Sequence, residues 1–118
     1  MVINHKDKTI EERLKESKKV FEKYPDRLCI YIEKSEKCKI VNNLEKNKYI
    51  IPNTISVAEF IVIIRKRINI TSEQGIFFFV NNITISGNTL MLDIYNKHKA
   101  EDNFLYITYS GENCFGGK

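Results

Sequence analysis

Two strand-like segments that are apolar on both faces constrain this chain most. Residues 28–33 read LCIYIE and residues 104–109 read FLYITY. Side chains alternate between the two faces of a strand, so each segment needs apolar cover on both sides. A chain of 118 residues is long enough for one compact domain and too short for two. We therefore expect both segments at the centre of one sheet, with helices on both of its faces.

Two capping boxes predict where the main helices begin. TIEE (9–12) and SVAE (56–59) each place a hydroxyl residue three positions before a glutamate. The hydroxyl can accept a first-turn amide while the glutamate reaches back to the capping residue. The first helix is expected to end before Pro25. The second is expected over 57–68, where apolar residues recur at helical spacing.

The remaining segments complete an α-β-β-α-β-α-β order. Pro52 stops a strand at 49–51, and this strand is expected at the sheet edge because it is short. IFFFV (76–80) and ITIS (83–86) resemble a strand with a tight return through two asparagines. A third helix is expected over 90–98. This arrangement is typical of a β-grasp sheet.

Groups that could perform catalysis or bind metal are sparse. Cys29, Cys38 and Cys114 form no CxxC pair, and with only His5 and His98 available no zinc-site spacing can be built. His5 lies in an N-terminal segment expected to fray, and His98 ends a predicted helix, where the dipole favours a cation. A nucleophilic enzyme needs a base beside its Cys or Ser. We expect no catalytic residue, metal site or cofactor, and no enzyme activity.

The charge pattern does not indicate a nucleic-acid partner. Residues 1–69 hold sixteen lysines and arginines against ten aspartates and glutamates, including Arg65-Lys66-Arg67. The aromatic residues that would stack on bases lie in the predicted strands and helix faces instead of among these cations. Cations at a helix end also have a structural role near the dipole. We expect an acidic partner, and no nucleic acid.

No segment predicts membrane insertion or secretion. The chain has no run of about 18 apolar residues. Its first residues, MVINHKD, also lack the apolar core of a secretory signal. A cytoplasmic location is therefore expected.

The predicted edge strand offers a surface for peptide binding. Lys46 and Lys48 precede it, so cations and apolar side chains flank its unpaired backbone groups. Such an edge can bind an extended acidic peptide by strand addition. The alternative is an edge that lysines merely protect against aggregation.

Glycine is concentrated at the C-terminus. Gly111, Gly116 and Gly117 are three of the five glycines and lie in the last eight residues. A residue with no side chain can enter a narrow enzyme channel and leaves its carbonyl open to attack, which suits transfer of a C-terminal carboxylate. The alternative is a frayed terminus.

Six segments, in order, match one family. They are KYPDR (23–27), KYIIP (48–52), IRKRI (64–68), FFFVNN (77–82), EDNFLYITYSGE (101–112) and FG (115–116). From about Glu12 to Gly116 the chain resembles the ubiquitin-like modifiers of autophagy, nearest to the GABARAP type. The resemblance implies an α+β ubiquitin-like β-grasp fold, with a four-stranded mixed sheet and two additional N-terminal helices. The implied divisions are a helical extension (1–26), the β-grasp core (27–110) and a flexible C-terminal tail (111–118).

The resemblance implies a modifier that is the substrate of other enzymes. A processing cysteine protease, an activating enzyme and a conjugating enzyme would join its C-terminal glycine to phosphatidylethanolamine on autophagosome or other vesicle membranes. By position this glycine is Gly116, which follows Phe115, and Gly117-Lys118 would be removed. Gly117 is the alternative if cleavage falls one residue later. The alternative function is an unconjugated trafficking or cytoskeletal adaptor.

The resemblance also implies a groove for receptors and adaptors with aromatic-x-x-aliphatic motifs. Its aromatic pocket would comprise Glu16, Val20, Lys48, Ile50 and Phe104, and its aliphatic pocket Tyr49, Ile51, Pro52, Ile55, Phe60 and Ile63. Arg27, Lys46 and Arg65 would meet acidic residues or the peptide backbone. Cys29 stands in the aromatic pocket where relatives usually have proline. Cysteine is smaller and carries a backbone N–H, which leaves pocket depth and partner preference open.

Overall fold

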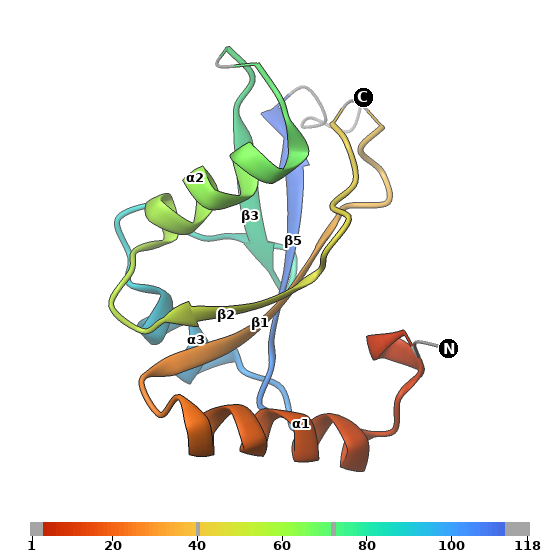
Figure 1. The fold of residues 1–118 in the computed structure, drawn as a ribbon. Coiled ribbons are helices and arrows are strands. Elements are labelled where there is room, and N and C mark those ends of the chain that lie inside the picture. Colours follow the sequence, from red (N-terminus) through yellow and green to blue (C-terminus); the bar gives the residue numbers. More distant parts are fainter. Residues whose placement is uncertain (1–3, 40, 72, 113–118) are drawn as a thin grey trace.

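One mixed sheet organises the residues that the structure describes. The computed structural model describes residues 4–39, 41–71 and 73–112 (Figure 1). Its elements are η1 (His5–Asp7), α1 (Ile10–Lys23), β1 (Arg27–Lys34), β2 (Lys48–Pro52), α2 (Val57–Ile68), β3 (Ile76–Val80), β4 (Ile83–Thr84), α3 (Met91–His98) and β5 (Leu105–Gly111). The strand order is β2-β1-β5-β3-β4.

The strands that are apolar on both faces lie inside the sheet, as predicted. β1 pairs in parallel with β5 and antiparallel with β2, and β5 pairs antiparallel with β3. β2 occupies the edge, which confirms that prediction. The sheet has a fifth strand, β4, beyond the four expected.

The fifth strand is the return of a tight hairpin. Asn81 and Asn82 both have positive φ, 52° and 66°, which is the conformation of a type I′ turn. β4 covers two residues of the predicted 83–86, because the chain turns again at Ser86, whose carbonyl accepts the Thr89 N–H at 3.2 Å.

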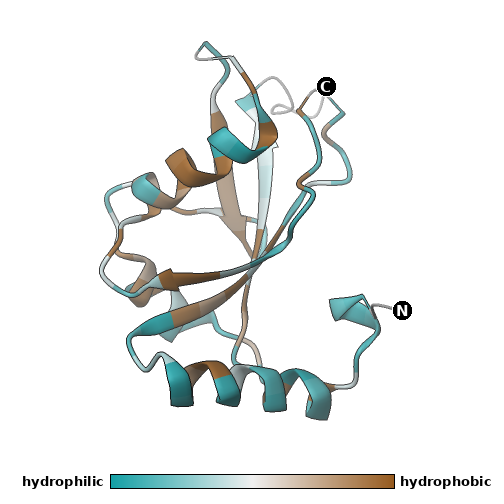
Figure 2. Ribbon diagram, viewed as in Figure 1, coloured by the Kyte–Doolittle hydropathy of each residue, from teal (hydrophilic) through white to brown (hydrophobic). Residues whose placement is uncertain are grey.

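Helices cover both faces of the sheet, as predicted from the two strands that are apolar on both faces. Leu28, Ile30 and Ile32 pack in the larger core, to which α2 contributes Val57, Phe60, Ile64 and Ile68 and α3 contributes Met91 and Tyr95. On the opposite face, Cys29, Tyr31 and Phe104 form a smaller cluster covered by Val20 and Phe21 of α1. Figure 2 shows α1 as a largely hydrophilic helix beside more hydrophobic strands, consistent with a helix buried along one stripe only.

The polar segment between β1 and β2 enters the core, which the sequence did not predict. Cys38, Val41 and Leu44 are all buried there. Val41 also explains a glycine, since a Cβ on Gly111 would lie 2.9 Å from its Cγ1. Gly111 ends β5, two residues beyond the predicted strand.

The N-terminal segment is docked, and the expectation that His5 frays is wrong. His5 is only 3% exposed. It begins η1, a short 3-10 helix whose Lys6 N–H donates to the Asn4 side chain at 3.2 Å. The capping box at Thr9 then starts α1. η1 and α1 are thus the two N-terminal helices.

Candidate functional site

A cavity of about 260 Å³ lies where α1, the β1–β2 edge and the start of β5 meet. Eight side chains line it, and all eight belong to the groove predicted from the sequence. They are Glu16, Val20, Cys29, Lys46, Lys48, Tyr49, Ile50 and Phe104. Residues from four separate segments are therefore assembled into one hollow.

Strand alternation gives the cavity its apolar side. Lys48 and Ile50 point outward from β2, whereas Tyr49 between them is buried. Cys29 of β1 is the register partner of Ile50, so both lie at the same level of the sheet. Ile50 remains 44% exposed. A large apolar side chain left this open on an edge strand provides contact area for a ligand.

Lysines lie around the opening of the cavity, and the Glu16 carboxylate forms ion pairs with two of them. Glu16 accepts from Lys48 at 2.8 Å and from Lys8 at 3.2 Å. Burial raises the pKa of Glu16, but these two hydrogen bonds outweigh it and hold the pKa below its usual value. Lys46 Nζ lies 5.5 Å from the centre of the Tyr49 ring. The rim is therefore cationic and favours an acidic partner.

Cys29 acts as an apolar floor and not as a nucleophile. Its side chain is 1% exposed. Burial, aided by the charges of Glu16 and Asp102, raises the pKa of the Cys29 thiol to about 11. The thiol stays protonated at neutral pH, and only the thiolate is strongly nucleophilic.

The edge beside the cavity has the geometry for strand addition. Within the described part of the chain, β2 has a strand neighbour on one side only, namely β1. Its outer side can pair with an extended peptide, whose alternate side chains would then reach the cavity.

The residues predicted for the aliphatic pocket differ widely in exposure. Ile51 and Phe60 are buried in the larger core, beneath the surface. Ile63 is 36% exposed, Ile55 is half-buried and Pro52 is exposed. Apart from Tyr49, none of this set lines the cavity described above.

The two predicted arginines make contacts within the chain. Arg27 lies 5.7 Å from the ring centre of Tyr24. Arg65 donates to the carbonyl of Thr71 at 2.8 Å and to that of Gln74. Arg65 therefore holds the loop that follows α2.

The predicted conjugation residues lie outside the described part of the chain. These are Phe115, Gly116 and the alternative Gly117. The described chain ends at Glu112, one residue after the end of β5, and its backbone N–H donates to the Gly75 carbonyl at 3.0 Å.

Sequence reasoning missed a polar group that positions Phe104. Asp102 is 2% exposed and accepts the Phe104 N–H at 2.9 Å, while its other oxygen accepts from the Tyr106 hydroxyl. Arg13 pairs with that same oxygen at 2.9 Å. An aspartate two positions before its bonded amide is a local turn signal that could have identified it.

The described residues offer neither a cluster of metal-ligating side chains nor a helix that could span a membrane. No group of three or more His, Cys, Asp and Glu side chains among them could hold a metal ion. No helix formed by them is long and apolar enough to cross a bilayer.

Comparisons with known proteins agree with the fold and the sequence motifs. A family model described as "Autophagy protein Atg8 ubiquitin like" matches residues 12–116. Autophagy-related protein 8e of Arabidopsis thaliana is 46% identical over 110 residues, 93% of this chain and 89% of that protein. Autophagy-related protein 8 of Schizosaccharomyces pombe is also 46% identical over 110 residues, with 93% and 90% covered. The crystal structure of Trypanosoma brucei ATG8 superposes with a TM-score of 0.89 at 37% identity, covering 95% of this chain and 96% of that one.

Proposed function

Because the chain belongs to the Atg8 family of ubiquitin-like autophagy proteins, we propose that it is conjugated through Gly116 to phosphatidylethanolamine and recruits receptors through the groove at β2. Family membership makes it a non-enzymatic modifier. Its partners would be the processing protease, the activating and conjugating enzymes, and receptors or adaptors with aromatic-x-x-aliphatic motifs. It would be cytoplasmic before conjugation and bound to autophagosomal or other vesicle membranes afterwards.

The cavity beside β2 carries the recruitment part of this proposal. It joins an apolar hollow, a cationic rim and an open strand edge in one place. An extended peptide paired with β2 would put an aromatic side chain into the hollow and acidic neighbours near Lys46 and Lys48.

The chemistry of the tail supports the conjugation part. A glycine carbonyl is unhindered, so it suits successive transfers between enzymes and a lipid amine. Phosphatidylethanolamine supplies two acyl chains, which are enough for stable membrane anchoring.

The direct test is the mass of the protein before and after starvation, in cells with and without the processing protease. We expect a processed chain that ends at Gly116 and gains the mass of the lipid during starvation. A processed chain that ends at Gly117 would move the conjugated residue by one position. A protein that keeps Lys118 and gains no lipid would favour the unconjugated adaptor.

The groove is tested by replacing its exposed isoleucine. Ile50→Ala is expected to weaken binding of an aromatic-x-x-aliphatic peptide about tenfold. Alanine lacks three of the side-chain carbons of isoleucine, and their partial burial under the peptide contributes about 1.4 kcal/mol of binding free energy. Ile83→Ala is the matched control, since Ile83 is 66% exposed on the opposite edge of the sheet. Calorimetry measures both affinities. Equal affinities for the two variants would contradict the groove assignment.

A further inference from the structure

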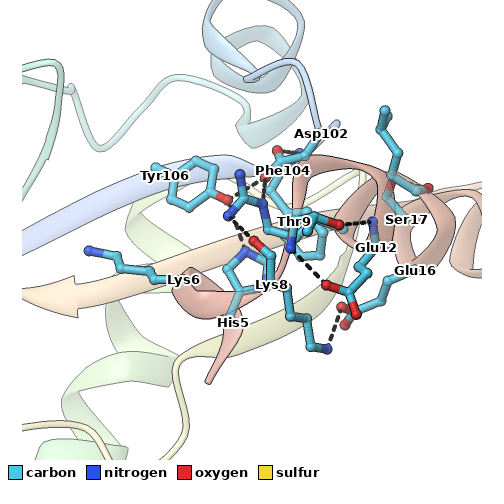
Figure 3. Close-up of polar contacts among 12 residues, drawn as sticks. His5, Lys6, Lys8, Thr9, Glu12, Glu16, Ser17, Asp102, Phe104 and Tyr106 are labelled. Carbon is cyan, nitrogen blue, oxygen red and sulfur yellow. Dashed lines mark hydrogen bonds and ion pairs between the residues drawn. The ribbon is translucent and has the colours of Figure 1, made fainter. Parts of the chain in front are cut away.

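The N-terminal segment buries a histidine among three aromatic rings behind the groove. The His5 ring stacks on Tyr31, with ring centres 4.8 Å apart and planes at 20°. It also meets Phe104 edge-on at 4.6 Å and lies 5.8 Å from the ring centre of Tyr106. Figure 3 shows His5 beside Phe104 and Tyr106, with Asp102 on the far side of that pair. Burial of a charged side chain costs much more free energy than burial of a neutral one, so this site favours the neutral imidazole.

The hydrogen-bond chain defines which nitrogen of His5 carries the proton. The Tyr106 hydroxyl donates its one hydrogen bond to Asp102, so it can only accept a hydrogen bond from His5. His5 Nε2, at 2.9 Å, is therefore the donor to Tyr106. Nδ1 then holds a bare lone pair, and it is buried without a hydrogen-bond partner among the described residues. A second proton on the ring would have to occupy this nitrogen.

The charged groups around His5 are already paired with each other. Those acting on His5 are Arg13 and Glu16 of α1, Lys48 of β2 and Asp102 before β5. Lys6, the next residue in the chain, lies over the Tyr31 ring with its Nζ 5.6 Å from the ring centre, and the hydroxyls of Tyr31 and Tyr106 are also nearby. Glu16 bonds Lys8 and Lys48, Asp102 pairs with Arg13, and Lys6 pairs with Glu33. Burial first, and then the Lys48 charge, lower the pKa of His5 to about 4, although Glu16 and Asp102 raise it. The docked site thus favours the neutral ring.

The same rings support the groove. Phe104 is 3% exposed, packs in one cluster with Cys29 and Tyr31, and lines the cavity beside β2. His5 therefore covers one side of a ring whose other surroundings form the proposed peptide site. Lys8, which immediately follows η1, contacts Glu16 on the cavity rim. Release of this segment would remove both supports.

We propose that residues 4–8 form an N-terminal latch that acid releases: protonation of His5 undocks the segment from Tyr31, Phe104 and Tyr106, and the aromatic pocket loses its support and its affinity for peptide. The coupling to peptide rests on the function proposed above. The release of the latch does not.

The direction and size of the effect follow from proton linkage. The neutral ring is favoured in the docked state, so docking is strongest above the ordinary histidine pKa of about 6.5 and weakens as pH falls toward about 4. Between pH 7.4 and 5.0 the docking equilibrium should fall on the order of twentyfold. Mildly acidic conditions are thus sufficient to change it.

Latch release is measured by hydrogen exchange in the full chain. The Lys8 amide donates to the His5 carbonyl at 3.2 Å at the end of η1. A single 3-10 turn is not stable without tertiary packing, so protection of this amide depends on docking. Its protection factor is expected to fall on the order of twentyfold from pH 7.4 to 5.0. In His5→Phe, which keeps an aromatic ring but cannot titrate, it should stay nearly constant. His98→Gln, which removes the other histidine, should behave like the wild type. The same fall in His5→Phe as in the wild type would overturn the latch.

A second measurement covers the case in which His5→Phe fails to dock. The His5 imidazole of the wild-type protein is titrated by NMR, and its midpoint is expected well below 6.5, with the Phe104 ring resonances shifting alongside it. A midpoint near 6.5 would overturn the proposal, since the histidine would then not be held neutral.

Coupling to the groove is tested with a histidine-free synthetic peptide that has an aromatic-x-x-aliphatic core and acidic flanks. Its affinity for the wild type should fall several-fold more between pH 7.4 and 5.0 than its affinity for His5→Phe, because titration of the peptide itself affects both alike. Equal pH dependence would overturn the coupling. Failure of the wild type to bind at pH 7.4 would instead refute the proposed groove, while hydrogen exchange would still decide whether the latch opens.

Discussion

Gly116→Ala is expected to reduce the lipid-conjugated fraction of the protein by about a hundredfold or more. The proposed transfers require the Gly116 carbonyl to reach an attacking group through a narrow channel, and misplacement by about 1 Å at a reacting centre costs on the order of a hundredfold in rate. An added methyl group also restricts the backbone angles open to the residue. Membrane flotation of extracts from starved cells, with intact mass measurement, gives the conjugated fraction.

Gly117→Ala is the matched control, because it changes the neighbouring glycine in the same way. Under the proposal it leaves the conjugated fraction near that of the wild type. If Gly117→Ala abolishes conjugation and Gly116→Ala does not, the cleavage site lies one residue later. Wild-type membrane association of both variants would refute conjugation through this tail.

Asp102→Ala is expected to destabilise the folded protein by about 3–5 kcal/mol, the usual cost of leaving one partner of a buried ion pair alone. The carboxyl is 2% exposed, and its loss would leave the Phe104 amide and the Tyr106 hydroxyl without their acceptor and the Arg13 guanidinium without its ion-pair partner. A domain of this size is stable by about 5–15 kcal/mol in total. Urea denaturation followed by circular dichroism measures the loss.

Two variants separate the possible origins of that loss. Asp102→Asn keeps an oxygen that can accept the Phe104 amide, so it should cost less than alanine. Glu101→Ala removes a neighbouring exposed carboxylate and should change stability by no more than about 0.5 kcal/mol. A destabilisation by Asp102→Ala of the same size as that by Glu101→Ala would show that the buried cluster contributes little.

Local signals in the sequence predicted most helices and strands. The capping boxes at Thr9 and Ser56 begin α1 and α2 at the expected residues, and α2 ends at Ile68 as predicted. The apolar residues on both faces of 28–33 predicted both cores, because Ile30 and Tyr31 belong to opposite faces of the sheet. These features depend on residues within a few positions of each other, so the sequence alone contains them.

The residues that line the groove were predicted from a family resemblance and not from local signals. Cys29 and Phe104 are 75 positions apart, and no periodicity links them to Glu16. The parallel pairing of β1 with β5, which aligns Ile30 with Leu105, brings Cys29 and Phe104 together, and the packing of α1 adds Glu16. The burial of Cys38 and Leu44 in a lysine-rich segment likewise depends on distant residues that cover them.

The sequence by itself determined that this chain forms a sheet covered on two faces, with a cationic edge strand and a glycine-rich end. Only the tertiary structure decided that His5 is buried. The residue has polar neighbours and no helical or strand periodicity, so nothing local predicts a docked segment. Its burial depends on Tyr31 and Tyr106, which lie 26 and 101 positions away and are adjacent only because β1 and β5 pair. Local patterns specify elements, whereas contacts between paired strands specify where a polar residue can be buried.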